Sequence, residues 1–169
     1  MRRLAALALL LSMPPLAALA QEITVREDPR PPLLKQFDGE WLMKGDVLGK
    51  QVTYLLVAGP TLRARFTELH MRDTAEPPQY EARVFLGVDA ENGDLIAHWM
   101  DDFGARYSIP HGTGRIEGST LQFTFPYADG PFRDTLEFDQ RDGSWHFRIE
   151  AGQPDGSWKH FARYEIRRK

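Results

Sequence analysis

YEARVFLGV, residues 80–88, is the clearest of several runs in this chain in which every second side chain is apolar. The apolar face extends from Tyr80 to Val88, and Glu81 and Arg83 lie on the opposite face. A two-residue period with one apolar face is typical of an antiparallel sheet that packs on a core with one side only. The sequence contains no long amphipathic helix pattern, which argues against a parallel βαβ fold. The predicted fold class is therefore all-β.

Similar runs precede and follow this one, with short turn sequences between them. Three earlier runs would each turn one face inward, at Trp41–Val47, Val52–Leu56 and Leu62–Phe66. The predicted turns are Gly49, Gly59-Pro60, Asn92-Gly93, Gly118, Gly130-Pro131, Asp142-Gly143 and Asp155-Gly156. Asn-Gly and Asp-Gly pairs tolerate the positive φ angles of tight hairpins, so these positions favour a meander of adjacent strands.

The number of predicted strands indicates that the sheet closes on itself. An open meander of this many strands would leave two long edges free to pair with other chains, and an up-and-down barrel removes both edges. We therefore predict an antiparallel up-and-down barrel of about eight to ten strands over residues 33–169. A short helical turn at Leu33–Phe37, with Pro31 or Pro32 at its start, would precede the first strand.

The N-terminus has the three parts of an export signal. Met1-Arg2-Arg3 is positively charged, Leu4–Leu11 is apolar, and Ala18-Leu19-Ala20 is a small-residue cleavage site. The apolar run is shorter than the roughly 20 residues that span a bilayer. We therefore predict a signal peptide at residues 1–20, cleaved between Ala20 and Gln21, and a periplasmic or secreted protein.

Composition narrows the classes of function. Residues 21–32 are polar and rich in proline, which predicts a leader with little structure. Cleavage would remove two arginines and no acid, so the net charge changes from −3 (21 basic, 24 acidic) to −5 (19 basic, 24 acidic). An acidic chain without a basic block is a poor candidate for binding nucleic acid or anionic membranes. The absence of cysteine excludes disulfides and a lipid anchor on an N-terminal cysteine.

The first predicted strand opens with a Gly-x-Trp motif, Gly39-Glu40-Trp41. The chain resembles the bacterial family catalogued as domain of unknown function 1579 (DUF1579) at Phe37–Trp41, Gly87–Gly93, Trp99–Gly104 and Gly112–Gly118. The resemblance covers about residues 33–168 and implies a lipocalin-like barrel of the calycin type. In lipocalins an arginine of the last strand stacks on this tryptophan, which implies that Arg163 or Arg167 clamps Trp41 at a closed end of the barrel.

Polar side chains on the predicted inner faces are candidates for a ligand site. Strict alternation places the following residues in the lumen: Tyr54, Phe66, Glu68, His70, Tyr80, His160 and Tyr164. A few polar groups in an apolar pocket are typical of a small-molecule site. A buried Glu–His pair would have shifted pKa values, which are common at functional sites. The alternative for Glu68 and His70 is a position at the end of their strand, in contact with water.

The segment between two predicted strands at His98–Tyr107 is the densest polar and aromatic cluster. It would form the rim of one mouth of the barrel, with His98, Trp99, Asp102, Arg106 and Tyr107 as rim residues. Asp101 and Asp102 would point to opposite faces and could not share a proton, so we expect them to cap a turn or to pair with Arg106.

Two further motifs carry no catalytic or metal-binding prediction. His111 precedes Gly112-Thr113-Gly114, but a phosphate-binding loop needs a helix after it, so a bulge or tight corner is predicted. The five histidines have no metal-ligand spacing. No catalytic residue and no metal ligand is predicted from these patterns.

Three hypotheses about function, and a structural role as the remainder, are compatible with the sequence. The favoured one is a binding barrel for a small hydrophobic or amphipathic molecule, which requires a continuous inner cavity. A haem barrel of the nitrobindin type would use His160 as axial ligand. An enzyme would need Glu68, His70 or Arg83 to converge in the lumen. A structural or partner-binding role would show as an exposed apolar patch. The sequence identifies neither the ligand nor the oligomeric state.

Overall fold

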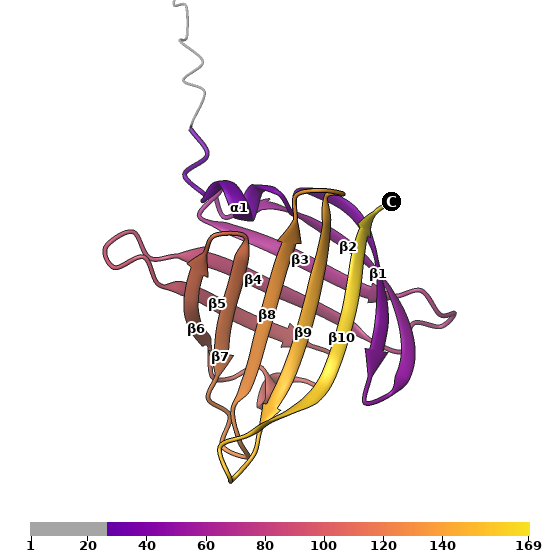
Figure 1. Cartoon of the computed structure of the whole chain (residues 1–169). Coiled ribbons are helices and arrows are strands. Elements are labelled where there is room, and N and C mark those ends of the chain that lie inside the picture. Colours follow the sequence, from indigo (N-terminus) through magenta and orange to yellow (C-terminus); the bar gives the residue numbers. More distant parts are fainter. Residues whose placement is uncertain (1–26) are drawn as a thin grey trace, which may run out of the picture.

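The computed structural model describes residues 27–169, so the predicted signal peptide and most of the predicted leader lie outside the described residues. Ten antiparallel strands close into a barrel (Figure 1). Each strand pairs with its neighbours in sequence, and the first strand pairs with the last to close the barrel. The predicted all-β, up-and-down barrel is therefore confirmed, with a strand number at the upper end of the predicted range.

The elements follow one another in a simple meander. They are α1 (Pro32–Lys35), β1 (Gly39–Val47), β2 (Lys50–Thr61), β3 (Phe66–Asp73), β4 (Glu81–Val88), β5 (Leu95–Asp101), the 3₁₀ helix η1 (Ala105–Tyr107), β6 (Gly112–Glu117), β7 (Thr120–Phe125), β8 (Phe132–Asp139), β9 (Ser144–Gly152) and β10 (Trp158–Arg168). The helical turn α1 lies where it was predicted. Proline occupies its first turn, because its missing N–H and fixed φ suit the start of a helix.

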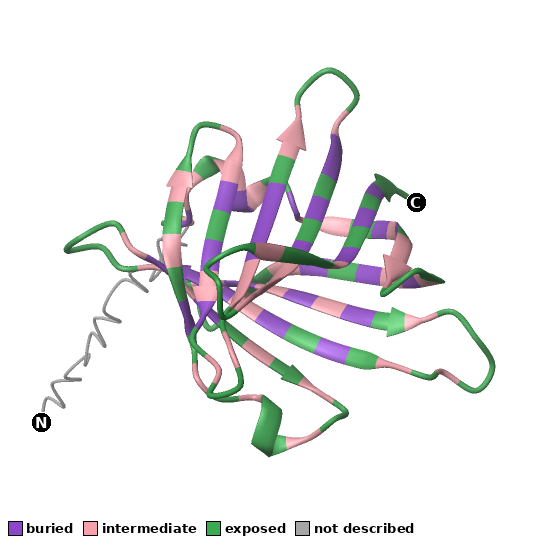
Figure 2. Ribbon diagram, turned by 60° about the horizontal axis from the view of Figure 1, so that its bottom comes forward, coloured by how far each residue is buried: buried purple, intermediate pink, exposed green. Residues whose placement is uncertain are grey.

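Buried and exposed residues alternate along the strands (Figure 2). In β4, Ala82, Val84 and Leu86 are buried, whereas Glu81 and Arg83 are exposed. The buried faces of the strands meet in one hydrophobic cluster inside the barrel. The lumen is therefore the core of the protein, and the outer wall faces water.

Trp41 and two other aromatic rings seal one end of the barrel, which we call the closed end. The Trp41 side chain is fully buried, and its Nε1–H donates a hydrogen bond of 2.6 Å to the carbonyl oxygen of Phe37. The ring of Phe37 stacks on that of Trp145, with the centroids 3.8 Å apart. Phe37 follows α1, so the helical turn brings this cap across the end of the barrel (Figure 1).

The arginine that stacks on Trp41 is Arg168, so the prediction of Arg163 or Arg167 is wrong. The guanidinium carbon of Arg168 lies 4.0 Å from the ring centroid of Trp41, and the two residues pair across the β1–β10 seam. Alternation along β10 places Arg163 and Arg167 on the exposed outer wall instead. The Arg168 guanidinium passes so close to Gly39 that a Cβ there would overlap it, and Gly39 also has a φ of 130°. Both facts require glycine at the start of the motif.

The end of the predicted leader, just before α1, has no regular secondary structure and packs against the closed end through Arg30. Arg30 is only 4% exposed and forms ion pairs of 2.7 Å with both Asp28 and Asp38. It also donates a hydrogen bond of 3.0 Å to the hydroxyl of Thr67. The Arg30 guanidinium lowers the pKa of Asp28 to about 2. One arginine is thus enough to fix an otherwise polar segment to the barrel.

One predicted turn is wrong, and the error changes the faces of β3. Gly59-Pro60 lies inside β2, and the chain reverses instead at Leu62–Ala64, where all three residues have positive φ angles between 49° and 61°. Leu62, predicted to face inward, is 64% exposed in this turn. In β3, Thr67, Leu69 and Met71 are the buried residues. Phe66, Glu68 and His70 therefore belong to the outer wall, because a shift of one residue reverses every side chain.

A β-bulge in β10 reverses the alternation a second time. The register of β10 against β9 shifts between His160 and Ala162, so Phe161 is an extra residue. After the bulge, Ala162 and Tyr164 are buried inside the barrel, as predicted for Tyr164. Before the bulge, His160 is paired with the outward-facing Glu150 and is exposed, so its predicted place in the lumen is wrong.

Candidate functional site at the open mouth of the barrel

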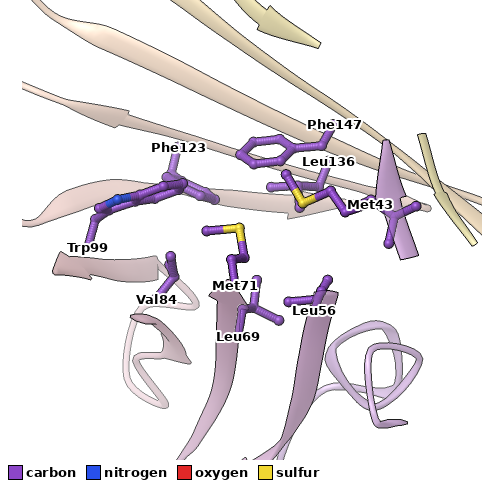
Figure 3. Close-up of a pocket in the computed structure, with 10 residues that line it drawn as sticks. Met43, Leu56, Leu69, Met71, Val84, Trp99, Phe123, Leu136 and Phe147 are labelled. Atoms are coloured by element: carbon purple, nitrogen blue, oxygen red, sulfur yellow. The ribbon is translucent and has the colours of Figure 1, made fainter. Parts of the chain in front are cut away.

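Side chains fill the lumen almost completely. The cavity between the walls has a volume of about 10 Å³, roughly the room that one water needs. Its lining is apolar and includes Met43, Met71, Trp99, Phe123 and Phe147, which converge from opposite walls (Figure 3). The continuous inner cavity that a deep ligand site requires is therefore not formed. Candidate binding groups must be sought at the end opposite Trp41, which we call the open mouth.

A chain of hydrogen bonds lies at the open mouth, where β4 begins and β5 ends. The indole Nε1–H of Trp99 donates to the hydroxyl of Tyr80 at 3.2 Å, and this hydroxyl donates to Asp101 Oδ2 at 3.3 Å. Burial raises the pKa of Tyr80 far above its usual value and also raises the pKa of Asp101. Burial at the mouth thus raises the pKa of both a phenol and a carboxyl.

Two more tyrosines adjoin this chain. The ring centroid of Tyr54 lies 5.5 Å from that of Tyr80 and 5.9 Å from that of Tyr164. Tyr54 and Tyr164 are buried in the inner wall, on β2 and β10. Burial is the largest cause that raises the pKa of Tyr164, and Tyr54 and Asp134 add to it. The prediction that these three tyrosines face inward is therefore correct, and they lie together.

Asp134 is an acid buried in the inner wall near these tyrosines. It lies on β8 between Phe123 of β7 and Ile149 of β9, and its side chain shares the face of Leu136. The residue is 2% exposed, and Oδ2 has no hydrogen-bond partner. Burial alone raises its pKa well above the usual range. A carboxyl of this kind destabilises the fold when it ionises, so its presence needs an explanation beyond packing.

Asp134→Asn is expected to raise stability increasingly as the pH rises above about 4. Because the folded-state pKa lies above the unfolded-state value of about 3.8, the unfolded chain loses its proton first, and wild-type stability falls until the pH passes the folded-state pKa. The facing phenols of Tyr127 and Tyr164 stay neutral in this range, because both have raised pKa values. Urea unfolding at pH 4 and pH 8 measures the difference, which should exceed about 1 kcal/mol at pH 8.

The control for this measurement is Glu137→Gln, on the exposed outer face of the same strand. It removes the same charge without changing the interior. The free energy of unfolding of this variant should therefore change with pH in the same way as that of the wild type. A constant offset between Asp134→Asn and the wild type over the whole pH range would show that Asp134 does not titrate in the folded protein.

Tyr127 of the β7–β8 connection lies near both acids of the mouth. Its ring stacks on Phe125 and meets Phe132 edge-on, with centroid distances of 5.7 and 5.8 Å. Burial is the main cause that raises its pKa to about 12, and the carboxyls of Asp134 and Asp101 contribute. Tyr127 therefore belongs to the aromatic group at the end of β7 and the start of β8, and it responds to the charge of both carboxyls.

Glu68 and His70, together with Arg83, lie on the outer wall and not in the lumen. Arg83 forms an ion pair with Glu68, and His70 Nε2 lies 2.6 Å from Glu81 Oε1. They border an open hollow of about 270 Å³ on the outer face of β2–β4. Phe66 also faces outward, and its ring covers Gly87 so closely that no Cβ would fit there. The converging lumen groups required by the enzyme hypothesis are therefore not present at these positions.

None of the five histidines lies inside the barrel. His160 Nε2 is 2.7 Å from Asp46 Oδ2 on the outer wall. The rings of His98 and His111 are 5.8 Å apart on exposed residues, and His70 and His146 also face outward. A haem in the lumen would find no histidine ligand there, so these residues do not fit the nitrobindin-type alternative. Among the described residues, no cluster of three or more His, Asp or Glu side chains could hold a metal ion.

The predicted rim segment does lie at the open mouth, but its residues divide between the two faces. Trp99 faces the lumen, whereas His98 is exposed on the outer wall. Asp101 Oδ1 accepts a hydrogen bond of 3.2 Å from the backbone N–H of Phe103 and so caps the turn, whereas Asp102 accepts one of 3.2 Å from the backbone N–H of Glu81 on β4. Arg106 lies 5.7 Å from the ring centroid of Tyr107, and within residues 27–169 it forms no ion pair with Asp101 or Asp102.

The β5–β6 connection beside the mouth carries several exposed apolar side chains. These are Phe103, Tyr107 and Ile109, with exposed fractions between 52% and 69%, and Met100 at the end of β5 is 46% exposed beside them. Phe103 packs against Tyr80 with ring centroids 5.7 Å apart, so the connection contacts the polar chain inside the mouth. Gly112 and Gly114, where a corner was predicted, belong instead to strand β6, and glycine is needed at 114 because the backbone of Gln122 and Phe123 in β7 lies too close for a Cβ.

Sequence reasoning missed Asp134 and Tyr127. The signal for Asp134 was present, because Phe132, Leu136 and Phe138 form an apolar face with one acid at an inward position. A charged residue on an otherwise apolar strand face is worth examining as a site. No pattern identifies Tyr127, because it belongs to a connection and not to a strand.

The comparisons with known proteins support the fold only. No protein-family model matches the chain, and the search of curated proteins finds no match. The crystal structure of Rv2717c from M. tuberculosis is similar, with a TM-score of 0.56 and 14% identity over 83% of this chain and 99% of that chain. A redesigned beta barrel has a TM-score of 0.33 and 13% identity over 81% of this chain and 95% of that chain.

The fold and the strand order together define the class of this protein as a calycin-like barrel of ten antiparallel strands. Membership of the DUF1579 family stays a prediction, because no family model matches. None of the helices in residues 27–169 is long and apolar enough to cross a bilayer.

Proposed function

We propose that this protein is an exported, periplasmic, lipocalin-like barrel that binds a small hydrophobic or amphipathic molecule at its open mouth. The observation that carries the proposal is the composition of that mouth. Exposed apolar side chains of the β5–β6 connection adjoin Tyr80, which is hydrogen-bonded to Asp101, and a second acid, Asp134, is buried in the inner wall at the same end of the barrel. An apolar surface next to a few directed polar groups is the usual make-up of a small-molecule site.

The contrast between the two ends of the barrel supports this location. At the closed end, the polar groups of Trp41 and Arg30 are hydrogen-bonded within the chain. Two buried side-chain atoms of the described residues lack a partner: Trp145 Nε1 at the closed end, a neutral N–H on the indole that stacks on Phe37, and Asp134 Oδ2 at the open mouth, an oxygen of an ionisable carboxyl. Unsatisfied buried groups are rare in folded proteins and occur where a ligand or water completes the site. The mouth is therefore the better candidate for a ligand.

Binding is favoured over catalysis by the positions of the ionisable groups. Glu68, His70 and Arg83 form ion pairs on the outer wall and do not converge on a common point in the lumen. The signal-like N-terminus supports export.

Purification from the periplasm followed by native mass spectrometry tests the proposal. We expect a polypeptide that begins at Gln21 and carries a small non-covalent molecule. Phe103→Ser removes a ring that is 69% exposed at the mouth, and burial of such a ring by a ligand is worth about 1.5–3 kcal/mol. The variant should therefore weaken binding at least about tenfold.

Leu62→Ser is the matched control, because Leu62 is 64% exposed in the β2–β3 turn at the closed end. It should leave binding unchanged. An equal loss in both variants would place the site elsewhere. Failure of the wild-type protein to carry or bind any hydrophobic or amphipathic molecule would refute the proposed function.

A further inference from the structure

We infer that the molecule bound at the mouth carries an organic cation, an amine or quaternary ammonium group, and that the carboxylate of Asp134 is its anchor. This inference rests on the proposed function and specifies its ligand class. It starts from the one buried acid that the fold leaves without a partner.

The charges of the barrel interior favour a cation over an anion. Within residues 27–169 the buried charged residues are Arg30 and Asp134. Arg30 is held at the closed end by Asp28 and Asp38, so it cannot neutralise Asp134. Asp101 adds a second, half-buried carboxyl to the same mouth. An anionic head group would meet like charge there, whereas a cation would stabilise the ionised form of Asp134.

Basic residues near this end point away from the interior. Arg133, next to Asp134 on β8, faces the outer wall, where it pairs with Glu150 at 2.8 Å and lies over Trp158 at 4.3 Å. Lys50 and Lys159 are exposed at the start of β2 and β10. The described chain thus supplies no cation of its own to the Asp134 carboxyl.

The aromatic rings around the mouth provide the second element of a cation site. Tyr54, Tyr80 and Tyr164 form a continuous group with centroid distances of 5.5 and 5.9 Å. Tyr127 extends the aromatic wall toward Asp134. Aromatic faces combined with a carboxylate are the means by which proteins recognise amines and quaternary ammonium groups.

Access to Asp134 requires a side chain to move. Asp134 is 2% exposed, and Tyr127, which lies near it, belongs to the connection between β7 and β8 and not to the sheet. A loop side chain changes rotamer far more easily than a strand separates. In the proposed complex the cation lies beside the Asp134 carboxylate, and the alkyl part of the ligand lies along the apolar β5–β6 connection.

Three probes with the same dodecyl chain test the inference: dodecyltrimethylammonium, laurate and tetraethylene glycol monododecyl ether. Calorimetric titration below their micellar concentrations should show the cation binding at least tenfold more tightly than the other two. Asp134→Asn should weaken the affinity for the cationic probe at least tenfold and leave the affinity for the neutral probe unchanged. Glu137→Gln, on the outer face of β8, should change neither affinity.

The possible results separate this inference from the proposed function. Equal affinity for the three probes, or an Asp134→Asn variant that binds the cation as well as the wild type, would overturn the cation inference. Neither result would contradict the proposed function, the binding of a small hydrophobic or amphipathic molecule. Absence of binding by all three probes, with no molecule carried from the periplasm, would overturn both. Cooperative unfolding of Asp134→Asn confirms that the variant is folded before its affinity is compared.

Discussion

Trp41→Ala is expected to lower the free energy of unfolding by about 3–5 kcal/mol, the cost of removing a large aromatic side chain from a packed core. Trp41 is fully buried, donates a hydrogen bond to Phe37, and lies beneath the guanidinium of Arg168. Its removal would leave a cavity at the closed end and would also free the carbonyl oxygen of Phe37. Equilibrium unfolding in urea, followed by circular dichroism, measures the change.

Trp158→Ala is the control, because Trp158 also stacks with an arginine, Arg133 at 4.3 Å, but on the outer wall. A partly exposed cation–π pair contributes only about 0.5–1 kcal/mol, so this variant should be close to wild type. If Trp41→Ala cost no more than Trp158→Ala, Trp41 would not be the seal of the closed end.

Gly45→Ala is expected to cost about 3 kcal/mol or more, because it would force apart the seam that closes the barrel. A Cβ at Gly45 would overlap the carbonyl oxygen of Arg163 and come within 2.7 Å of the Cα of Tyr164. Both contacts are backbone atoms of β10, so no side-chain rotation can relieve them. Thermal unfolding and proton exchange of the β1–β10 amides would show the loss, with exchange fastest along the seam.

Gly59→Ala provides the matched comparison. Gly59 also lies inside a strand, but a Cβ there would meet no atom within 4 Å. Exchange of glycine for alanine at such an unstrained position is neutral or slightly stabilising, by about 0.4–1 kcal/mol. Equal destabilisation by the two variants would mean that the β1–β10 approach at Gly45 is not tight.

The barrel itself was predictable because alternation is a local property that each strand carries in its own sequence. Tyr80–Val88 identified one face without any knowledge of its neighbours. The face of β3 was misassigned because Phe66 suggested a core position. Leu69 and Met71 lie on the other face of the strand from Glu68 and His70, and these two apolar residues indicate the buried face more reliably than Phe66.

The remaining errors have their origin in contacts between distant segments. The bulge at Phe161 exists only in the pairing of β10 with β9, so the sequence of β10 alone predicted His160 on the wrong face. The choice of Arg168 over Arg163 and Arg167 depends on the register that pairs it with Trp41. Register between strands far apart in sequence is a tertiary property, which strand patterns do not specify.

The candidate site was predicted in part. Tyr54, Tyr80, Tyr164 and Trp99 were recognised as inward or rim residues, and the structure brings them together. Asp134 was missed because inner-face candidates were sought near the motifs and not along every apolar face. Its isolation is visible only when the partners of its carboxyl can be examined.

The pairing of β1 with β10 sets the order in which the chain acquires its stability. Trp41 is paired with Arg168, so the seam that closes the barrel joins the first strand to the end of the last one. While the polypeptide is being synthesised, β1 has a partner on one side only and its free edge can join another chain. The seam that joins Trp41 to Arg168 can therefore form only after the last strand has been synthesised.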